Sequence, residues 1–367
     1  MNVLFAGGGS GGHLYPALAI ARAMVAADPR IQPFFVGAER GIEKTILPET
    51  EFPYQLLDLH PLYRSNVWLN WKTVAGSAVS WREISRIITE KAPCALVATG
   101  GYAAGVALAV ARSRKLPIVI QDQNSVPGLT VRWFASAAAQ LHLGFPESAR
   151  SLRVGRNTVI FDSGNPIAPP PALNERPSRS EALKRWGFEP SEALTLLVFG
   201  GSQGAEAINR VVAKWVQRVT GKMVRVIWAT GPANFGRYAR LENAAVRVVP
   251  YISTMAQAYT ATDLALTRAG ASTTAELSAW GIPAVLVPLP SAAADHQTQN
   301  ARTVVAAGAA EMISQADLTP DTLQAAVSRL VANPIVLHDM REKTLMRARP
   351  NAAQDIAMNI LSLNCFK

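Results

Sequence analysis

The sequence of 367 residues has few cysteines and few charged side chains. Its two cysteines, Cys94 and Cys365, provide neither a disulfide framework nor a zinc-ligand cluster, which is typical of a protein in a reducing cytoplasm. Charged residues make up 17 % of the chain and hydrophobic ones 49 %. This balance excludes a disordered chain and favours a globular α/β protein with more than one core.

Targeting, membrane-spanning and metal-binding patterns are also missing. No basic segment precedes the first apolar run, so we expect no secretory signal. The uncharged stretch 92–111 has the length of a membrane span, but it is mostly Ala and Gly and contains Gly100-Gly101. A buried strand, a glycine turn and a helix are expected there instead. No H-x-x-x-H or D-x-D pattern occurs, so we expect no metal and no cofactor.

Acidic residues are fewer than basic ones, 26 against 36, which gives a formal net charge of +10. Nucleic acid, anionic lipid headgroups and phosphorylated substrates would all be attracted to such a chain. No helicase or RNA-binding motif accompanies the charge, so nucleic acid is the weakest of the three.

Short apolar runs alternate with helical patterns along the whole chain. Runs at 2–6, 33–38, 95–100 and 117–122 come first, and five more follow between 194 and 289. This alternation predicts an α/β fold with parallel sheets covered by helices on both faces. The stretch 145–190 is rich in Pro, Ser and charge and predicts a connector between two domains.

Two glycine turns each join a predicted strand to a predicted helix. The first is "GGGSGGH", which ends on His13, with Pro16 near the expected helix start, and the second is "GGSQG" at 200–204. Such turns direct N–H groups and a helix dipole at an anion, usually a phosphate. His13 is then a candidate general base and Ser202 a pyrophosphate ligand, while a turn residue and a helix cap are the structural alternatives.

Two further loops follow predicted strands in the second half. Thr273 and Glu276 have the spacing of a capping box, although a carboxylate there could also accept hydrogen bonds from sugar hydroxyls. The loop "ADHQTQ" places Asp295, His296 and Gln297 beyond a buried strand, where polar side chains often bind ligands.

Tryptophans and basic residues interleave between residues 63 and 88. This pattern is typical of a membrane-docking surface and equally of an ordinary helix with a buried aromatic face. The candidate docking residues are Trp68, Trp71, Lys72, Trp81 and Arg82.

Six motifs follow one another along nearly the whole chain: "GGGSGGHLYPALAIA", "GGYAAGVALAVA", "QDQNSVPGLTVRWFA", "GGSQGAEAIN", "RAGASTTAELSAWGIPAVLVPLP" and "DHQTQNA". In sequence and in order they resemble the motifs of the MurG glycosyltransferases. The resemblance implies a GT-B fold: two Rossmann-like, doubly wound α/β domains facing each other across a cleft. We expect an acceptor and membrane-facing domain at 1–163 and a UDP-GlcNAc-binding domain at 164–340. A helical segment at 341–367 follows, and the sequence leaves open whether it packs back on the first domain.

The resemblance also implies an activity. The family transfers N-acetylglucosamine (GlcNAc), with inversion, from UDP-GlcNAc to the C4 hydroxyl of undecaprenyl-pyrophosphoryl-MurNAc-pentapeptide (lipid I), and the product is lipid II. The expected setting is peptidoglycan synthesis on the cytoplasmic face of the inner membrane, linked to cell shape, cell division and cell-wall synthesis proteins. The expected partners are UDP-GlcNAc, lipid I and an anionic membrane surface, without nucleic acid.

Positions that match the family's motifs carry expected roles. His13 matches the base, Ser202 the pyrophosphate ligand, Ile252 the residue against uracil, and Glu276 the ligand of the ribose hydroxyls. The remaining expected UDP-GlcNAc contacts are Ser10, Gly11, Gly12, Asn124, Ala271, Ser272, Thr273, Thr274, Ala275 and Gln297.

Two positions depart from the family pattern. The family usually has an arginine after "GNPV", where this chain has Ala168, so another cation must replace it or the donor binds more weakly. In "QDQN", Gln121 stands where many members have His, and Asp122 replaces Glu. Both changes put more weight on His13.

Three other functions remain open at this point. A nicotinamide-dependent oxidoreductase would use Glu39 for the ribose, but it leaves the second glycine turn unexplained. A UDP-GlcNAc 2-epimerase would not need the tryptophan-rich basic segment. A membrane-binding protein without enzymatic activity would leave the phosphate loops idle.

Overall fold

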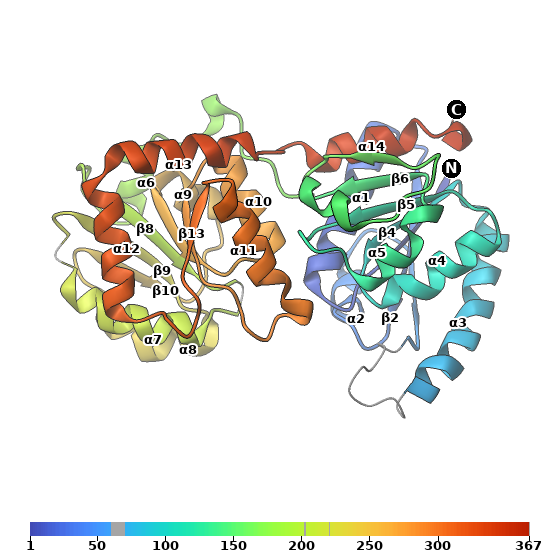
Figure 1. The fold of residues 1–367 in the computed structure, drawn as a ribbon, viewed down its shortest axis with the longest axis horizontal. Helices are drawn as coiled ribbons and strands as arrows, with labels where there is room; N and C mark the ends of the chain where they lie inside the picture. Colours follow the sequence, from blue (N-terminus) through green and yellow to red (C-terminus); the bar gives the residue numbers. More distant parts are fainter. Residues whose placement is uncertain (60–69, 202, 220, 367) are drawn as a thin grey trace. The chain divides into compact units, whose positions relative to one another are not determined.

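The computed structural model describes residues 1–59, 70–201, 203–219 and 221–366, with no side chains described for 70–77. The chain divides into two compact units. Unit 1 comprises residues 1–168 and 351–367, and unit 2 comprises residues 169–350. Each unit is built on one parallel sheet with helices packed against it (Figure 1).

Unit 1 contains a seven-stranded sheet in the order β3-β2-β1-β4-β5-β6-β7, with every neighbouring pair parallel. The strands are β1 (Asn2–Gly7), β2 (Gln32–Ala38), β3 (Tyr54–Leu57), β4 (Ala95–Gly100), β5 (Ile118–Asp122), β6 (Gln140–Leu143) and β7 (Val159–Phe161). The helices are α1 (Gly11–Ala27), α2 (Glu43–Ile46), α3 (Asn70–Lys91), α4 (Ala103–Ser113), α5 (Leu129–Phe134) and α14 (Ala352–Leu361).

The central strands of unit 1 are apolar on both faces because helices cover both. In β1, Val3 and Phe5 join a cluster with α1 and α14, whereas Leu4 and Ala6 join a second cluster with α3 and α4. Successive strand side chains point to opposite faces, so a strand between two helical layers needs apolar residues at every position. This explains the continuous apolar runs in the sequence.

Unit 2 contains a six-stranded parallel sheet in the order β10-β9-β8-β11-β12-β13. Its strands are β8 (Leu194–Phe199), β9 (Val224–Ala229), β10 (Val246–Val249), β11 (Leu264–Thr267), β12 (Ala284–Leu286) and β13 (Ala310–Met312). Its helices are α6 (Arg179–Arg185), α7 (Glu206–Trp215), α8 (Pro232–Tyr238), α9 (Met255–Ala261), α10 (Ala271–Trp280), α11 (His296–Ala306), α12 (Pro320–Ala332) and α13 (Pro334–Met346).

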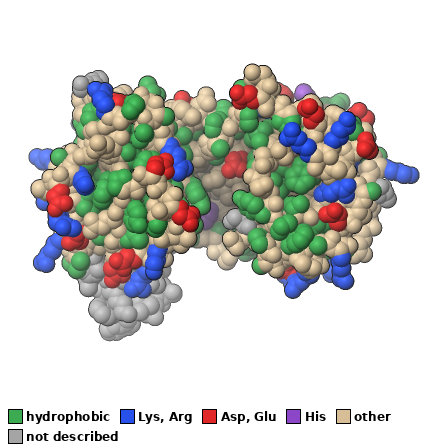
Figure 2. Space-filling model, turned by 180° about the vertical axis from the view of Figure 1, so that it is seen from behind, with side chains coloured by type: hydrophobic (Ala, Val, Ile, Leu, Met, Phe, Trp, Pro, Cys, Tyr) green, Lys and Arg blue, Asp and Glu red, His purple; other side chains and the backbone are tan. Residues whose placement is uncertain are grey.

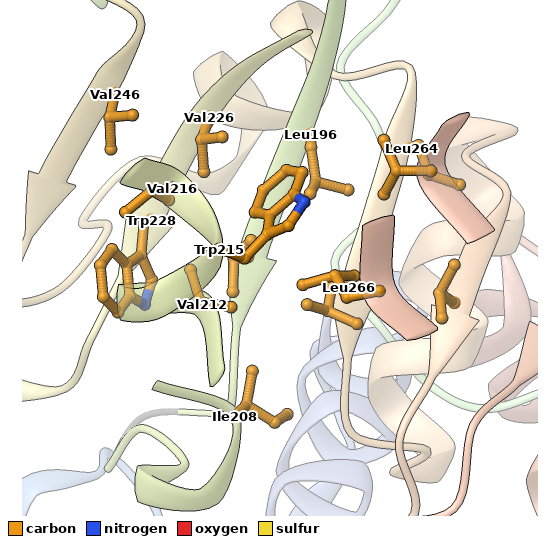
Figure 3. Packing of buried hydrophobic residues seen from close by; sticks show 14 of the residues in the cluster. Leu196, Ile208, Val212, Trp215, Val216, Val226, Trp228, Val246, Leu264 and Leu266 are labelled. Atoms are coloured by element: carbon orange, nitrogen blue, oxygen red, sulfur yellow. The ribbon is translucent and has the colours of Figure 1, made fainter. Parts of the chain in front are cut away.

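The core of unit 2 is anchored by two buried tryptophans (Figure 3). Trp215 ends α7 and Trp228 lies on β9, and both are exposed by 1 % or less. Their ring nitrogens donate to Gln324 Oε1 at 2.8 Å and Asn209 Oδ1 at 3.0 Å. Burying a large aromatic ring stabilises a core strongly provided that its polar atom has a partner, as both do here.

Each unit has the strand order of a doubly wound nucleotide-binding fold, which confirms the expected α/β class. The direction in which successive strands are added to the sheet reverses between β1 and β4 in unit 1, and between β8 and β11 in unit 2. Loops at the carboxyl ends of these strands form the usual ligand crevice of such sheets. Both glycine turns lie there.

Several sequence-based boundaries were wrong. The helix after the first turn begins at Gly11, so Pro16 lies inside it rather than at its start. The expected connector 145–190 contains the edge strand β7 and the helix α6, both too short to show a clear apolar period. The units divide after residues 168 and 350 rather than after 163 and 340, because α13 belongs wholly to unit 2.

The C-terminal helix α14 packs in unit 1, a point that the sequence left open. Ile356, Ala357 and Ile360 are fully buried in the cluster that includes α1. Gln140 also donates to the carbonyl oxygen of Asn359 at 2.8 Å. The stretch 92–111 forms β4 and most of α4, as expected. Within the described part of the chain, every helix is too short or too polar to cross a membrane.

Candidate functional site

Three loops meet at the carboxyl edge of the unit 1 sheet: those after β1, β4 and β5. The N–H of Gly8 donates to the carbonyl oxygen of Gly100 at 3.4 Å, and the Thr130 hydroxyl donates to that of Gly101 at 3.3 Å. A Cβ at Gly101 would lie 2.0 Å from the Gly8 oxygen. Only glycine therefore allows the first two loops to approach this closely.

His13 lies where these loops meet. It is the third residue of α1, and its ring lies against the turn after β4, where Gly100 and Gly101 have φ angles of 92° and 79°. A Cβ on Gly100 would come within 3.1 Å of the His13 Nδ1 atom. The Thr99 hydroxyl donates to the His13 carbonyl oxygen at 2.7 Å, which holds the start of the helix against β4.

The hydrogen bonds of His13 define which of its nitrogens can act as a base. Nδ1 lies 2.8 Å from Gln123 Oε1 and 2.9 Å from the carbonyl oxygen of Thr99. Both partners are acceptors, so the neutral ring carries its proton on Nδ1 and its lone pair on Nε2. That is the form a general base needs.

Glu43 has a buried carboxyl group beside the first glycine turn, and sequence analysis missed it. Its Oε1 accepts from the N–H of Gly9 at 2.9 Å and from that of Ala38 at 3.2 Å. A carboxyl group of the protein itself therefore accepts a hydrogen bond from a backbone N–H of the expected phosphate loop. Ser10, Gly11 and Gly12 remain exposed or half-buried at the start of α1.

The segment "QDQN" places its four residues differently. Gln121, Asp122 and Gln123 are buried, whereas Asn124 is half-buried. Asp122 accepts from the Asn124 N–H at 3.4 Å through Oδ1, and its Oδ2 has no hydrogen-bond partner among the described residues. Burial raises the pKa of Asp122 to about 7, despite the backbone hydrogen bonds that lower it.

In unit 2, the glycine turn after β8 packs against the loop after β9. A Cβ at Gly204 would lie 2.1 Å from the carbonyl oxygen of Thr230, and a Cβ at Gly231 would lie 2.2 Å from that of Gln203. The turn therefore needs its glycines for close backbone packing. Ser202, the expected pyrophosphate ligand, lies outside the described residues.

Helix α10 begins at the carboxyl end of β11 with Gly270 as its N-cap. It starts two residues before Thr273, so the capping-box interpretation of Thr273 and Glu276 was wrong. Ala271, Ser272 and Thr273 form the first turn, whose N–H groups and dipole favour an anion. Thr274 is buried, and its hydroxyl donates to the carbonyl oxygen of Ala271 at 2.9 Å.

Glu276 has a hydrogen-bond partner, Tyr259, that sequence analysis missed. The hydroxyl of Tyr259, on α9, donates to Glu276 Oε2 at 2.7 Å. Burial raises the pKa of Glu276, and this hydrogen bond opposes the increase. The ring of Tyr259 packs against Trp280 and Phe199, so its position is fixed by aromatic contacts.

Ile252, Gln297 and Arg268 complete the carboxyl edge of unit 2. Ile252 is 5 % exposed and lies in the loop after β10. Gln297, on α11, accepts from the Leu289 N–H at 3.0 Å. Arg268, which the sequence analysis passed over, follows β11 and donates to the carbonyl oxygens of Val287 and Pro288, both at 3.1 Å. Its guanidinium gives this edge a positive charge.

The expected docking residues are only partly described. Trp68 lies outside the described residues, and Trp71 and Lys72 lie on α3 in the part without described side chains. Trp81 is 40 % exposed and Arg82 is exposed, whereas Ile84 and Ile87 of the same helix are buried. In the described residues, no three His, Cys, Asp or Glu side chains are grouped to hold a metal ion.

Comparison with known proteins matches both halves of the chain to one family. Residues 3–143 match the glycosyltransferase family 28 N-terminal domain, and residues 195–358 match the family 28 C-terminal domain. A curated relative from Prosthecochloris aestuarii is 40 % identical over the full length of both chains. One from Carboxydothermus hydrogenoformans is 36 % identical, covering 97 % of this chain and 96 % of its own. Both are named UDP-N-acetylglucosamine–N-acetylmuramyl-(pentapeptide) pyrophosphoryl-undecaprenol N-acetylglucosamine transferase.

Solved structures agree with this match. The crystal structure of Acinetobacter baumannii MurG superposes with a TM-score of 0.77 at 27 % identity and covers 99 % of each chain. A UDP-GlcNAc 2-epimerase from Neisseria meningitidis, bound to UDP-GlcNAc, reaches a TM-score of 0.65 at 11 % identity. The second likeness concerns the fold alone.

Proposed function

The chain belongs to glycosyltransferase family 28, and on this premise we propose that it transfers GlcNAc from UDP-GlcNAc to undecaprenyl-pyrophosphoryl-MurNAc-pentapeptide. The observation that carries the proposal is full-length similarity to enzymes named for this reaction, at up to 40 % identity. The product is the lipid-linked disaccharide of peptidoglycan. Membership of this family excludes the nicotinamide-dependent oxidoreductase and the membrane-binding protein without enzymatic activity.

Unit 1 supplies the base in this proposal. Nε2 of His13 takes the proton of the acceptor C4 hydroxyl as the oxygen attacks C1 of GlcNAc from the face opposite UDP. The hydrogen bonds at Nδ1 support this role because they leave the lone pair on Nε2. Asn124 and the start of α1 are proposed to contact the donor sugar.

Unit 2 holds the nucleotide. Negative charge develops on the departing pyrophosphate, and the proposed groups that stabilise it without a metal are the first turn of α10, the turn at 200–204 and Arg268. Glu276 accepts hydrogen bonds from the ribose hydroxyls, Ile252 packs against uracil, and Gln297 contacts the sugar.

Transfer of labelled GlcNAc from UDP-GlcNAc to a lipid I analogue tests the reaction directly. The expected product is a disaccharide lipid with a β-linkage, since the reaction inverts the donor's anomeric centre. Hydrolysis or epimerisation of UDP-GlcNAc without transfer to the lipid would contradict the proposal.

The membrane-facing part of the proposal depends on α3. Trp81 and Arg82 are exposed beside each other, as an interfacial surface requires. On the face drawn in Figure 2, Lys and Arg side chains are spread over both units among Asp and Glu side chains. The side chains drawn in colour on that face form no concentrated positive patch. The proposal of docking at the inner face of the membrane therefore rests on the local aromatic and basic surface of α3.

A double variant, Trp81→Ala with Arg82→Glu, tests this surface by co-sedimentation with anionic vesicles. We expect weaker vesicle binding and unchanged affinity for UDP. The matched control is Ile335→Ala with Arg341→Glu, which makes the same kind of change at exposed positions of α13. Equal vesicle binding by parent and double variant would leave α3 as an ordinary surface helix.

A further inference from the structure

His13 takes part in a hydrogen-bond network in which backbone carbonyl oxygens determine which side-chain atoms donate and which accept. The Gln123 side chain donates through Nε2 to the carbonyl oxygen of Thr99 at 2.8 Å and to that of Gln121 at 3.3 Å. Carbonyl oxygens only accept, so the NH₂ group of Gln123 must lie on their side. Its Oε1 must then face His13 Nδ1, 2.8 Å away.

The orientation of Gln123 is supported by a second pair of amides. Gln123 Nε2 also donates to Gln121 Oε1, and Gln121 Nε2 donates to Asn165 Oδ1 at 3.2 Å. Asn165 Nδ2 in turn donates a hydrogen bond to the carbonyl oxygen of Gln123 at 3.0 Å, which closes the network. Gln121, Gln123 and Asn165 are all exposed by 2 % or less. Turning over Gln123 would bring its oxygen against other acceptors, and turning over Gln121 or Asn165 would bring two donors together as well as two acceptors. Buried polar groups that lose their partners in this way destabilise a fold.

From this closed pattern we propose that Gln123 is a positioning residue that keeps the proton of His13 on Nδ1 and so keeps Nε2 as the basic nitrogen. The proposal rests on the role of His13 as base and adds how its reactive form is selected. The orienting group is a neutral amide rather than a carboxylate. It therefore fixes the tautomer without the attraction that would stabilise the charged imidazolium.

The alternative is that Gln123 only fills a buried polar site. Both interpretations predict that replacing it lowers the melting temperature, so stability alone does not distinguish them. They differ in the pH dependence of kcat and in the protonation of the His13 ring.

Two variants separate the interpretations. In Gln123→Met the acceptor is lost while the shape is kept, and we expect kcat to fall about 10- to 100-fold, as for loss of other partners that orient a histidine. The KM for UDP-GlcNAc should change little, because the nucleotide contacts lie in unit 2. In Gln123→Glu a carboxylate faces Nδ1, and the acid limb of the kcat profile should move up by roughly one pH unit or more, because an adjacent negative charge favours the imidazolium.

The chain offers a matched control in a second glutamine–histidine pair. Gln140 Oε1 lies 3.2 Å from Nε2 of the buried His142, on the neighbouring strand β6. Gln140→Glu introduces the same charge beside a different histidine of the same sheet. We expect it to affect stability without moving the acid limb.

¹⁵N NMR of the His13 ring provides a readout that does not depend on activity. The parent should show Nδ1 protonated and Nε2 unprotonated at high pH. Gln123→Met should show a measurable share of the other tautomer, since only the Thr99 carbonyl oxygen then remains as an acceptor for Nδ1–H. The proposal is overturned if two results occur together: the acid limb of the kcat profile does not move in Gln123→Glu, and the His13 tautomer does not change in Gln123→Met. If the tautomer changes while His13→Ala keeps its kcat, the positioning role stands and the base assignment fails.

Discussion

The carboxyl edges of the two sheets share a topology and differ in chemistry. In unit 1 the edge holds His13, hydrogen-bonded to the neutral amide of Gln123, and the buried carboxyl groups of Asp122 and Glu43. In unit 2 it holds the start of α10, the cation Arg268 and Glu276, whose carboxyl group accepts a hydrogen bond from Tyr259. In the proposed reaction, the first edge moves a proton and the second holds an anion and a sugar. Since the two sheets share a topology, the loops account for this proposed difference.

The comparison is tested most strongly at His13. If unit 1 handles the proton and unit 2 the nucleotide, His13→Ala should lower kcat by roughly 10²–10⁴-fold, the usual contribution of a positioned base. The acid limb of the pH profile should also flatten. Titration with UDP should give nearly the parent's Kd. A variant with a lower melting temperature but an unchanged pH profile would make His13 a structural residue of the turn.

Asp122 tests whether the unit 1 edge is the pH-sensitive one. Its pKa is about 7 in the fold against 3.8 in the unfolded chain, so the fold loses stability as the pH rises from about 4 to 7. Asp122→Asn removes that loss, and urea unfolding at pH 8 should show a gain of up to about 4 kcal/mol, since one pKa unit corresponds to about 1.4 kcal/mol. At pH 4 the variant and the parent should be nearly equal.

His142 gives the opposite pH dependence in the same unit. Burial lowers its pKa from 6.5 to about 4, so the unfolded chain takes up a proton in this range and the fold does not. Stability of the Asp122→Asn variant should therefore rise as the pH increases from about 4 to 6.5. A stability curve of Asp122→Asn that stays flat over this range would contradict the assignment.

Glu276 tests the sugar-holding role of unit 2. Glu276→Gln should raise the Kd for UDP by about 10- to 100-fold, because hydrogen bonds to a charged group contribute about 1.5–3 kcal/mol. Calorimetry with 2′-deoxy-UDP is the control, since the variant should lose less affinity for a ligand with one hydroxyl fewer. Because burial raises the pKa of Glu276, parental affinity for UDP should also weaken on acidification. An equal loss for both nucleotides would separate Glu276 from the ribose.

The smallest expected effect is that of a chelator. If helix N–H groups and Arg268 stabilise the leaving pyrophosphate, transfer in excess EDTA should proceed at about the parental rate. Loss of activity in EDTA that one divalent ion restores would mean that unit 2 does not hold the anion by itself.

Much of the fold was predictable because burial leaves a local pattern in the chain. All nine apolar runs became strands, and both glycine turns lie at the edges where ligands bind. Four strands were missed: β3, β6, β7 and β13. They are three or four residues long and include partly exposed or polar positions, so their composition does not differ from that of loops.

The sequence by itself determined the two α/β units, the glycine turns, His13 beside the first turn and the acidic residue Glu276 in the first turns of α10. Only the tertiary structure decided which nitrogen of His13 carries the proton, because its partner Gln123 is 110 residues away along the chain. The same holds for Glu43, 34 residues from the amide it binds, and for Tyr259 behind Glu276. Periodicity records whether a position is buried. It does not record which donor meets which acceptor, since that depends on strands and loops that approach each other only when the chain has folded.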